Sequence, residues 1–66
     1  MPIVEVTLVK GRTPEELRAM ITAVTMAVSQ TVAAPVSSIR VIIREVPTTH
    51  FAAGDVTIAE RTAAAT

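Results

Sequence analysis

Apolar residues dominate the start of the chain and are interrupted at regular intervals by polar ones. Ile3–Val9 is rich in β-branched side chains, which favour extended backbone. Within this run Glu5 and Thr7 alternate with apolar neighbours, as on a strand with one wetter face. Lys10–Arg12, which contains a glycine, then marks the end of the strand. We therefore predict a strand over residues 3–9.

The following segment predicts a helix of about twenty residues. Thr13 and Glu16 have the spacing of a capping box, and Pro14 suits the first helical position. Pro35 ends the helix, because it disfavours helical geometry in the residue before it. The apolar stripe, spaced by three and four residues, consists of Leu17, Met20, Ile21, Val24, Ala27, Val28 and Val32.

A second β-prone run, Ile39–Val46, begins after a Ser37-Ser38 turn and ends at Pro47. A strand, a helix and another strand in this order form a βαβ unit, so the strands should be parallel with a right-handed crossover. We predict an α+β fold: one domain over residues 1–66, built on this unit and followed by a short C-terminal hairpin or strand.

The C-terminal part carries weaker patterns. Thr48–Ala53 is predicted as a loop, and Gly54-Asp55 as a turn. Val56–Ile58 could form a short strand, which we expect to pair with another subunit because it would be marginal alone. Glu60–Thr66 is small and polar, and we expect a frayed tail.

Size and composition indicate a protein that completes its core by self-association. The chain has 66 residues, no Cys, Trp or Tyr, and a single Phe, yet half of its residues are hydrophobic. A chain this short buries only about 60% of the surface that it exposes when unfolded. Because it has no disulfide, and a single His makes a structural zinc site improbable, we expect an obligate oligomer with larger shared sheets.

Charge and hydropathy argue against three other classes of protein: nucleic-acid binders, membrane-spanning proteins and secreted proteins. The six Lys and Arg residues balance the six Asp and Glu residues, which argues against a nucleic-acid binder. No apolar run approaches the roughly 20 residues needed to cross a bilayer. The N-terminus lacks the basic and apolar regions of a secretory signal, so we expect the cytoplasm as the default location.

Pro2 is the first candidate for chemistry. If Met1 is removed, Pro2 carries a secondary amine that can accept and release a proton; if Met1 is kept, its nitrogen is an amide and cannot act as a base. Burial and nearby cations would lower the pKa of that amine towards neutrality, where a general base works best. Arg12, Arg40 and Phe51 accompany it, although a lone arginine is usually solvated and a phenylalanine usually packs.

Several short motifs occur in one order and spacing: Pro2-Ile3, Gly11-Arg12, Ala34-Pro35, Ser38–Ile43, Glu45 and His50-Phe51. Together with the helix they resemble the 4-oxalocrotonate tautomerase family along nearly the whole chain, to about Ala59. The combined spacing of the proline, the two arginines and the phenylalanine is specific, whereas any one of these motifs alone is weak.

The resemblance implies a fold and a chemistry. It implies β-α-β protomers that dimerise into a four-stranded sheet, with three dimers forming a homo-hexamer or, in some relatives, a hetero-hexamer. Pro2 would be the general base, Arg12 would hold a substrate carboxylate, Arg40 would bind the other end and polarise the carbonyl region, and Phe51 would form the aromatic wall. Neither a metal nor an organic cofactor is required.

Departures from the family pattern refine this expectation. Leu8 and Val9 are pocket-lining positions whose side chains would affect substrate preference. Lys10 adds a cation near Arg12, although a solvated lysine is the simpler interpretation, and the role of His50 is open. Hydrolytic dehalogenases of the superfamily carry a carboxylate two positions after the aromatic wall. That position is Ala53 here, which disfavours dehalogenation.

The leading hypothesis is a cofactor-independent isomerase that ketonises a small 2-hydroxy-dienoate, such as 2-hydroxymuconate, of the kind met in aromatic-compound degradation. One alternative is a non-catalytic or partner-dependent subunit of a hetero-oligomer, which lends Arg40 or Phe51 to its partner. Another keeps the enzyme but changes the substrate to an aryl enol. Membrane and nucleic-acid partners are not expected.

Overall fold

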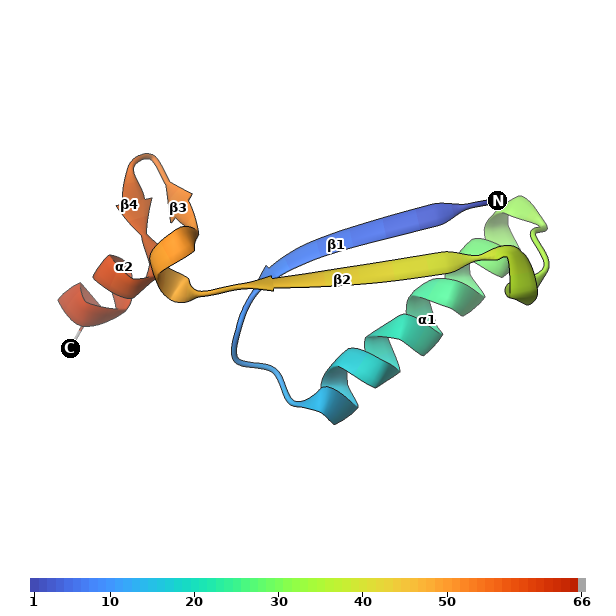
Figure 1. Cartoon of the computed structure of the whole chain (residues 1–66), viewed down its shortest axis with the longest axis horizontal. Coiled ribbons are helices and arrows are strands. Elements are labelled where there is room, and N and C mark those ends of the chain that lie inside the picture. The colour runs from blue at the N-terminus through green and yellow to red at the C-terminus, as the bar shows by residue number, and fades with distance from the viewer. Residues whose placement is uncertain (66) are drawn as a thin grey trace.

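A computed structural model describes residues 1–65, in which a β-α-β unit is followed by a smaller C-terminal unit (Figure 1). Strand β1 (Ile3–Val9) leads into helix α1 (Pro14–Val32), and strand β2 (Arg40–Val46) returns beside β1. The strands are parallel, with the first residues of β1 and β2 opposite each other and their last residues likewise. These elements confirm the predicted βαβ unit, except that β2 begins one residue later than expected.

Helix α1 begins and ends where its sequence predicts. The Thr13 hydroxyl accepts a hydrogen bond from the Glu16 N–H at 3.1 Å, and the Glu16 carboxylate accepts one from the Thr13 N–H at 2.9 Å. This capping box satisfies two backbone donors that the first helical turn leaves free. At the other end Ala33 takes a left-handed conformation with φ of 56°, and Pro35 follows. The short 3₁₀ helix η1 (Val36–Ser38) then connects to β2.

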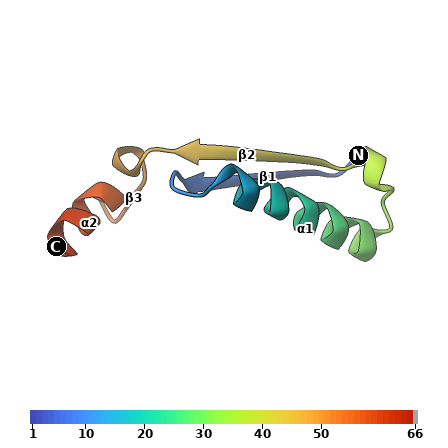
Figure 2. The ribbon, with the colours of Figure 1, turned by 90° about the horizontal axis from the view of Figure 1, so that it is seen from below.

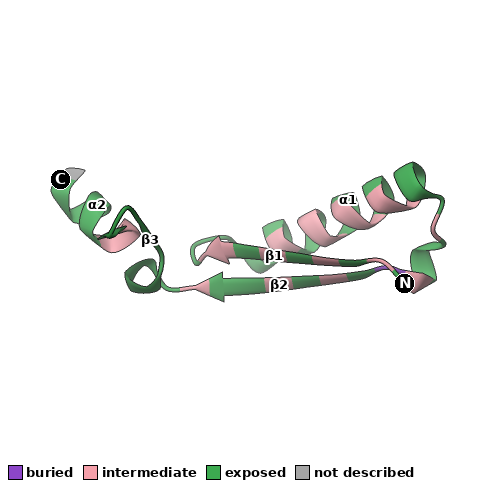
Figure 3. Ribbon diagram, turned by 90° about the horizontal axis from the view of Figure 1, so that it is seen from above, coloured by how far each residue is buried: buried purple, intermediate pink, exposed green. Residues whose placement is uncertain are grey.

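The sheet has one covered and one bare face. Helix α1 lies on one side of β1 and β2, and no helix or strand among residues 1–65 lies on the other (Figure 2). Half-buried residues alternate with exposed ones along both strands, and the half-buried residues of α1 turn towards the sheet (Figure 3). Ala27 and Val32 of the predicted apolar stripe are exposed, and Val32 is the last residue of α1.

The bare face is partly apolar. Ile3 is 58% exposed and Ile42 is 41% exposed. On the same face Glu5, which is opposite Ile42, forms an ion pair of 3.5 Å with Arg44 of the neighbouring strand. Both charged side chains are more than half exposed, so this pair contributes little to the stability of the protomer alone.

The C-terminal unit has the predicted turn but differs from the sequence prediction in the segment before it. It comprises the 3₁₀ helix η2 (Thr48–His50), strands β3 (Ala52–Ala53) and β4 (Val56–Thr57), and helix α2 (Ile58–Ala65). The predicted Gly54-Asp55 turn is present, and both residues have positive φ. Thr48–Ala53, predicted as a loop, contains η2 and β3 instead. Strand β4 is one residue shorter than the predicted strand over residues 56–58 and pairs antiparallel with β3 of the same chain, and its pairing with another subunit stays a prediction.

The predicted frayed tail is instead helix α2, apart from Thr66, which lies outside the described residues. Its start is a second capping box. The Glu60 carboxylate accepts hydrogen bonds from the Thr57 N–H at 2.8 Å and from the Thr57 hydroxyl at 3.0 Å, and the Glu60 N–H donates back to that hydroxyl at 3.1 Å. The Thr-x-x-Glu spacing was present in the sequence, but no apolar stripe follows it.

The protomer does not enclose a core of its own. Its radius of gyration is 15.3 Å, whereas a compact chain of this length has a radius of about 11 Å. Within residues 1–64 the one buried apolar side chain is Ile39, at 8% exposure. No helix among the described residues has the length and apolar character to cross a membrane. A structure this open must bury more apolar surface against another chain to be stable.

Replacing Ile42 by lysine tests whether the bare face is an interface. Ile42→Lys places a charge on that face, and we expect smaller assemblies and a midpoint of thermal unfolding lower by at least several degrees. Sedimentation and calorimetry measure the two effects. Ala19→Lys, on the side of α1 away from the sheet, is the control. An Ile42→Lys protein with unchanged mass and stability would contradict this use of the face.

Candidate active site

Pro2 and Arg40 lie together where both strands begin. The Arg40 N–H donates a hydrogen bond of 2.9 Å to the Pro2 carbonyl, and Arg40 is opposite Ile3 in the sheet. The Arg40 guanidinium turns back to donate to the Ser37 carbonyl at 3.0 Å. The parallel pairing therefore fixes the backbone of the predicted base beside that of one predicted cation.

The nitrogen of Pro2 has no basic character while Met1 is attached, because it is then part of a peptide bond. Met1 is 78% exposed and precedes the first residue of β1 by only one position. After removal of Met1 the Pro2 amine would be free. Its position would still be defined, because the carbonyl of the same residue accepts the hydrogen bond from the Arg40 N–H.

The other predicted residues lie at the opposite end of the strands. The Lys10 N–H donates to the Val46 carbonyl at 2.9 Å, which fixes the exit of β1 beside that of β2. The Arg12 guanidinium donates to the Val9 carbonyl at 3.1 Å. Phe51 follows β2 and η2 in the C-terminal unit, which projects away from the N-terminus (Figure 1).

The two groups are too far apart to act on one small molecule within a protomer. Strand β1 has seven residues, and at roughly 3.3 Å per residue its ends are about 20 Å apart. Pro2 and Arg40 mark one end, whereas Leu8, Val9 and Arg12 mark the other. Sequence analysis named these residues as candidates but did not separate them into these two groups.

The backbone around Phe51 is held by the segment that follows it. The Ile58 N–H donates to the Phe51 carbonyl at 2.9 Å, and Arg61 donates from its guanidinium to the Ala53 carbonyl at 2.9 Å. The Phe51 residue itself remains 37% exposed. Sequence analysis assigned no role to Thr57, Glu60 or Arg61, although the capping spacing of the first two was visible.

The remaining polar candidates make local contacts. His50 lies in η2, with its Nδ1 atom 2.9 Å from the Thr49 hydroxyl. The side chain of Lys10 is exposed. Among residues 1–65 no group of three or more His, Cys, Asp or Glu side chains could hold a metal ion.

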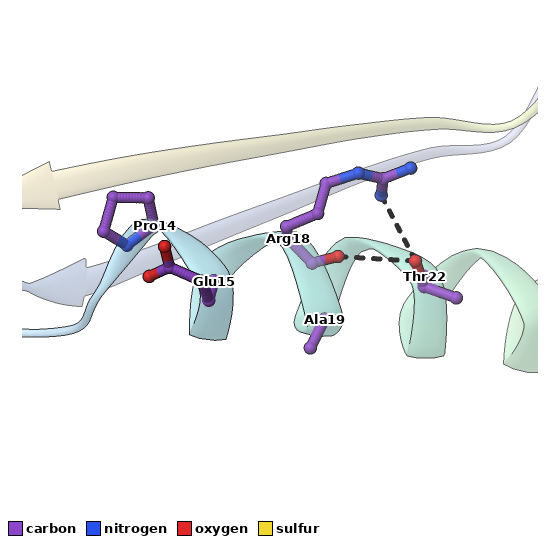
Figure 4. Close-up of a pocket in the computed structure, with 5 residues that line it drawn as sticks. All are labelled: Pro14, Glu15, Arg18, Ala19 and Thr22. Atoms are coloured by element: carbon purple, nitrogen blue, oxygen red, sulfur yellow. Dashed lines mark hydrogen bonds between the residues drawn. The ribbon is translucent and has the colours of Figure 1, made fainter.

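Two shallow grooves follow α1, away from the predicted residues. One is lined by Pro14, Glu15, Arg18, Ala19 and Thr22, and within it the Arg18 guanidinium donates to the Thr22 hydroxyl at 3.2 Å (Figure 4). The other lies between α1 and the start of β2 and includes Ile39. Neither groove is lined by the predicted base, the predicted arginines or the aromatic wall, so neither is the predicted site.

Comparison with known proteins shows the family of the chain. Residues 2–61 match the family model described as "Tautomerase enzyme", and the match begins at Pro2. A probable tautomerase of Ralstonia nicotianae is 49% identical over 51 residues, which cover 77% of this chain and 73% of that protein. A 2-hydroxymuconate tautomerase of Stutzerimonas stutzeri is 41% identical over 54 residues, covering 82% and 86%.

Solved structures show the same fold. TomN, a 4-oxalocrotonate tautomerase homologue in tomaymycin biosynthesis, superposes with a TM-score of 0.95 at 38% identity, covering 98% of this chain and 100% of TomN. A heterohexamer 4-oxalocrotonate tautomerase from Chloroflexus aurantiacus gives 0.88 at 32% identity, covering 91% and 97%. The chain belongs to the 4-oxalocrotonate tautomerase family of the tautomerase superfamily, whose members are generally isomerases.

The pKa of the Glu60 carboxyl gives a test of the second capping box. The hydrogen bonds from the Thr57 N–H and hydroxyl hold this pKa below its ordinary value. Because the folded-state pKa is depressed, the contribution of the cap is present above the ordinary glutamate pKa and is lost as pH falls through the lowered one. Carboxyl-carbon NMR should show this titration, with a higher midpoint in Thr57→Val, which lacks the hydroxyl. Equal midpoints in the two proteins would contradict the hydroxyl bond.

Proposed function

We propose that this protein is a cofactor-independent isomerase that ketonises a small 2-hydroxy-dienoate, with 2-hydroxymuconate as the reference substrate. The observation that carries the proposal is the pairing of Pro2 with Arg40 at the start of the sheet. Family membership supports it, since two relatives at 41% and 39% identity are named 2-hydroxymuconate tautomerases.

Pro2 would act as general base after removal of Met1. Its amine takes the proton of the 2-hydroxyl group, and the electron pair left on oxygen delocalises through the diene. The protonated Pro2 then returns that proton to a more distant carbon, so one O–H bond breaks and one C–H bond forms. Cations around the amine favour its unprotonated form at neutral pH.

The arginines would supply binding and charge stabilisation. A guanidinium stays protonated and can grip a carboxylate through two parallel hydrogen bonds, which is the role assigned to Arg12. Arg40 would stabilise the negative charge that develops on the dienolate oxygen. Phe51, with Leu8 and Val9, would wall the pocket and exclude water. Ala53 offers no carboxylate to activate water, which favours isomerisation over hydrolytic dehalogenation.

The site would be shared between protomers. The ends of β1 are about 20 Å apart, so Pro2 and Arg12 of one protomer cannot contact the same six-carbon acid. An antiparallel neighbour would bring its Arg12 end to the Pro2 end of this chain. We propose an assembly of this kind, a homo-hexamer in the simplest case, which also covers the exposed apolar residues of the sheet.

A hetero-oligomer is the second candidate. A structurally similar relative from Chloroflexus aurantiacus is described as a heterohexamer. In that case this chain would lend Arg40 or Phe51 to a site completed by a different chain. An active homo-oligomer of the purified protein would exclude the need for such a partner, and native mass spectrometry together with an assay measures this directly.

Replacing Pro2 or Arg40 tests the chemistry. Pro2→Ala and Arg40→Ala should each lower kcat/KM for 2-hydroxymuconate by at least about 100-fold, because each removes a group that acts in the transition state. The assembly should remain intact by sedimentation. Arg18→Ala, which removes an exposed α1 arginine bonded to Thr22, is the matched control with unchanged activity. Intact mass must first show that Met1 is absent, and normal turnover by Pro2→Ala would exclude the mechanism.

Hybrid assemblies test whether the site is shared. Pro2→Ala and Arg12→Ala proteins should each be nearly inactive alone. If they are unfolded together in equal amounts and refolded, about a quarter of the sites should combine an intact Pro2 from one protomer with an intact Arg12 from another. Activity should therefore return to roughly that fraction of the wild type. No recovery in mixtures whose mixed composition is verified by mass spectrometry would contradict a shared site.

A further inference from the structure

The C-terminal unit contains Phe51, the single Phe, Tyr or Trp residue of the protein, and this residue is only partly covered. Phe51 is 37% exposed, and it joins η2 to β3. Strands β3 and β4 have two residues each, and a hairpin this short is marginal by itself. The contacts of α2 are chiefly with η2 and β4, so the unit is held together mainly from within.

Hydrogen bonds from α2 and its cap connect this helix to the rest of the C-terminal unit. The N–H of Ile58, the first residue of α2, donates to the Phe51 carbonyl at 2.9 Å. Glu60 fixes the turn before Ile58 through its bonds of 2.8 and 3.0 Å with Thr57. Arg61 reaches across the hairpin to the Ala53 carbonyl at 2.9 Å. Each bond joins α2, or the cap at its start, to the segment that begins at Phe51.

We propose that Glu60 and Arg61 are positioning residues for Phe51, and that α2 is a brace that orients the aromatic wall of the site. This inference rests on the proposed function for the role of Phe51 as that wall. The brace would act on how well substrate is held, rather than on the proton transfer, because it contacts Phe51 through the backbone and the Phe51 ring carries no group that moves a proton.

The geometry gives each of the two residues a distinct part. Without the Glu60 carboxylate the Thr57 N–H loses its partner, and the first turn of α2 with the Ile58 bond can fray. Without the Arg61 guanidinium the Ala53 carbonyl of the hairpin loses its hydrogen bond from α2. Either change would let the Phe51 backbone move, whereas the sheet and α1 would be untouched.

A double-mutant cycle on the assembled enzyme tests the coupling. Glu60→Ala and Arg61→Ala should each raise KM for 2-hydroxymuconate roughly threefold to tenfold, with kcat within about twofold of wild type. In a Phe51→Leu background the same two substitutions should change KM by less than about 1.5-fold, because the ring to be positioned is already absent. Equal losses in both backgrounds, or an unchanged KM in the wild-type background, would overturn the proposal.

Two further variants separate positioning from general damage. Arg61→Lys keeps a donor at that position and should recover part of the lost affinity. Glu15→Ala removes a first-turn carboxylate from α1 that takes no part in either capping box, and it should leave KM unchanged. Sedimentation of each variant should show the wild-type assembly.

Fluorine NMR gives a readout that does not depend on the substrate. Because the chain has one Phe, incorporation of 4-fluorophenylalanine yields a single resonance from Phe51. Glu60→Ala and Arg61→Ala should shift or broaden it, and Glu15→Ala should not. Failure of the wild-type protein to ketonise 2-hydroxymuconate would contradict the proposed function. The fluorine spectrum would still test whether α2 positions Phe51. A resonance unchanged by both brace variants would reject the brace.

Discussion

The parallel pairing of β1 and β2 determines the rest of the molecule. Parallel strands start at the same end of a sheet and leave at the same end. Pro2 and Arg40 therefore lie together because each stands at the start of a strand, and the Arg40 N–H bonds the Pro2 carbonyl at 2.9 Å. By the same rule Arg12 and Phe51, which follow the ends of the two strands, are carried to the opposite end.

Stability and site assembly then depend on the same event. The protomer buries almost nothing fully, and its sheet exposes Ile3 and Ile42 on the face that α1 leaves bare. A neighbour that covers apolar surface of this kind also brings side chains from its own strand ends. An incomplete core and an incomplete site are thus two consequences of a chain that spans 45 Å in its longest dimension with only 66 residues.

Much of the fold was predictable because its signals are local. The period of two in β1, the Thr13 capping box and Pro35 each act within a few residues, and the structure has the elements they predict. Helix α2 was missed because its capping box precedes alanines and polar residues without an apolar stripe, so hydrogen bonds rather than packing define it. The proposed pairing of site residues across protomers has no local signal, since it depends on how two separate sheets meet.

The two ends of the protomer are fixed in different ways, and this difference bears on function. The Pro2 end is bonded into the sheet, as suits the proposed base, whose nitrogen must lie within hydrogen-bond distance of the proton it moves. The Phe51 end depends on the few hydrogen bonds of the C-terminal unit. A wall that recognises shape tolerates small displacements better than a proton-transfer group does. Under the proposed function, substitutions in α2 are therefore expected to change which acids fit while the chemistry at the sheet end stays the same.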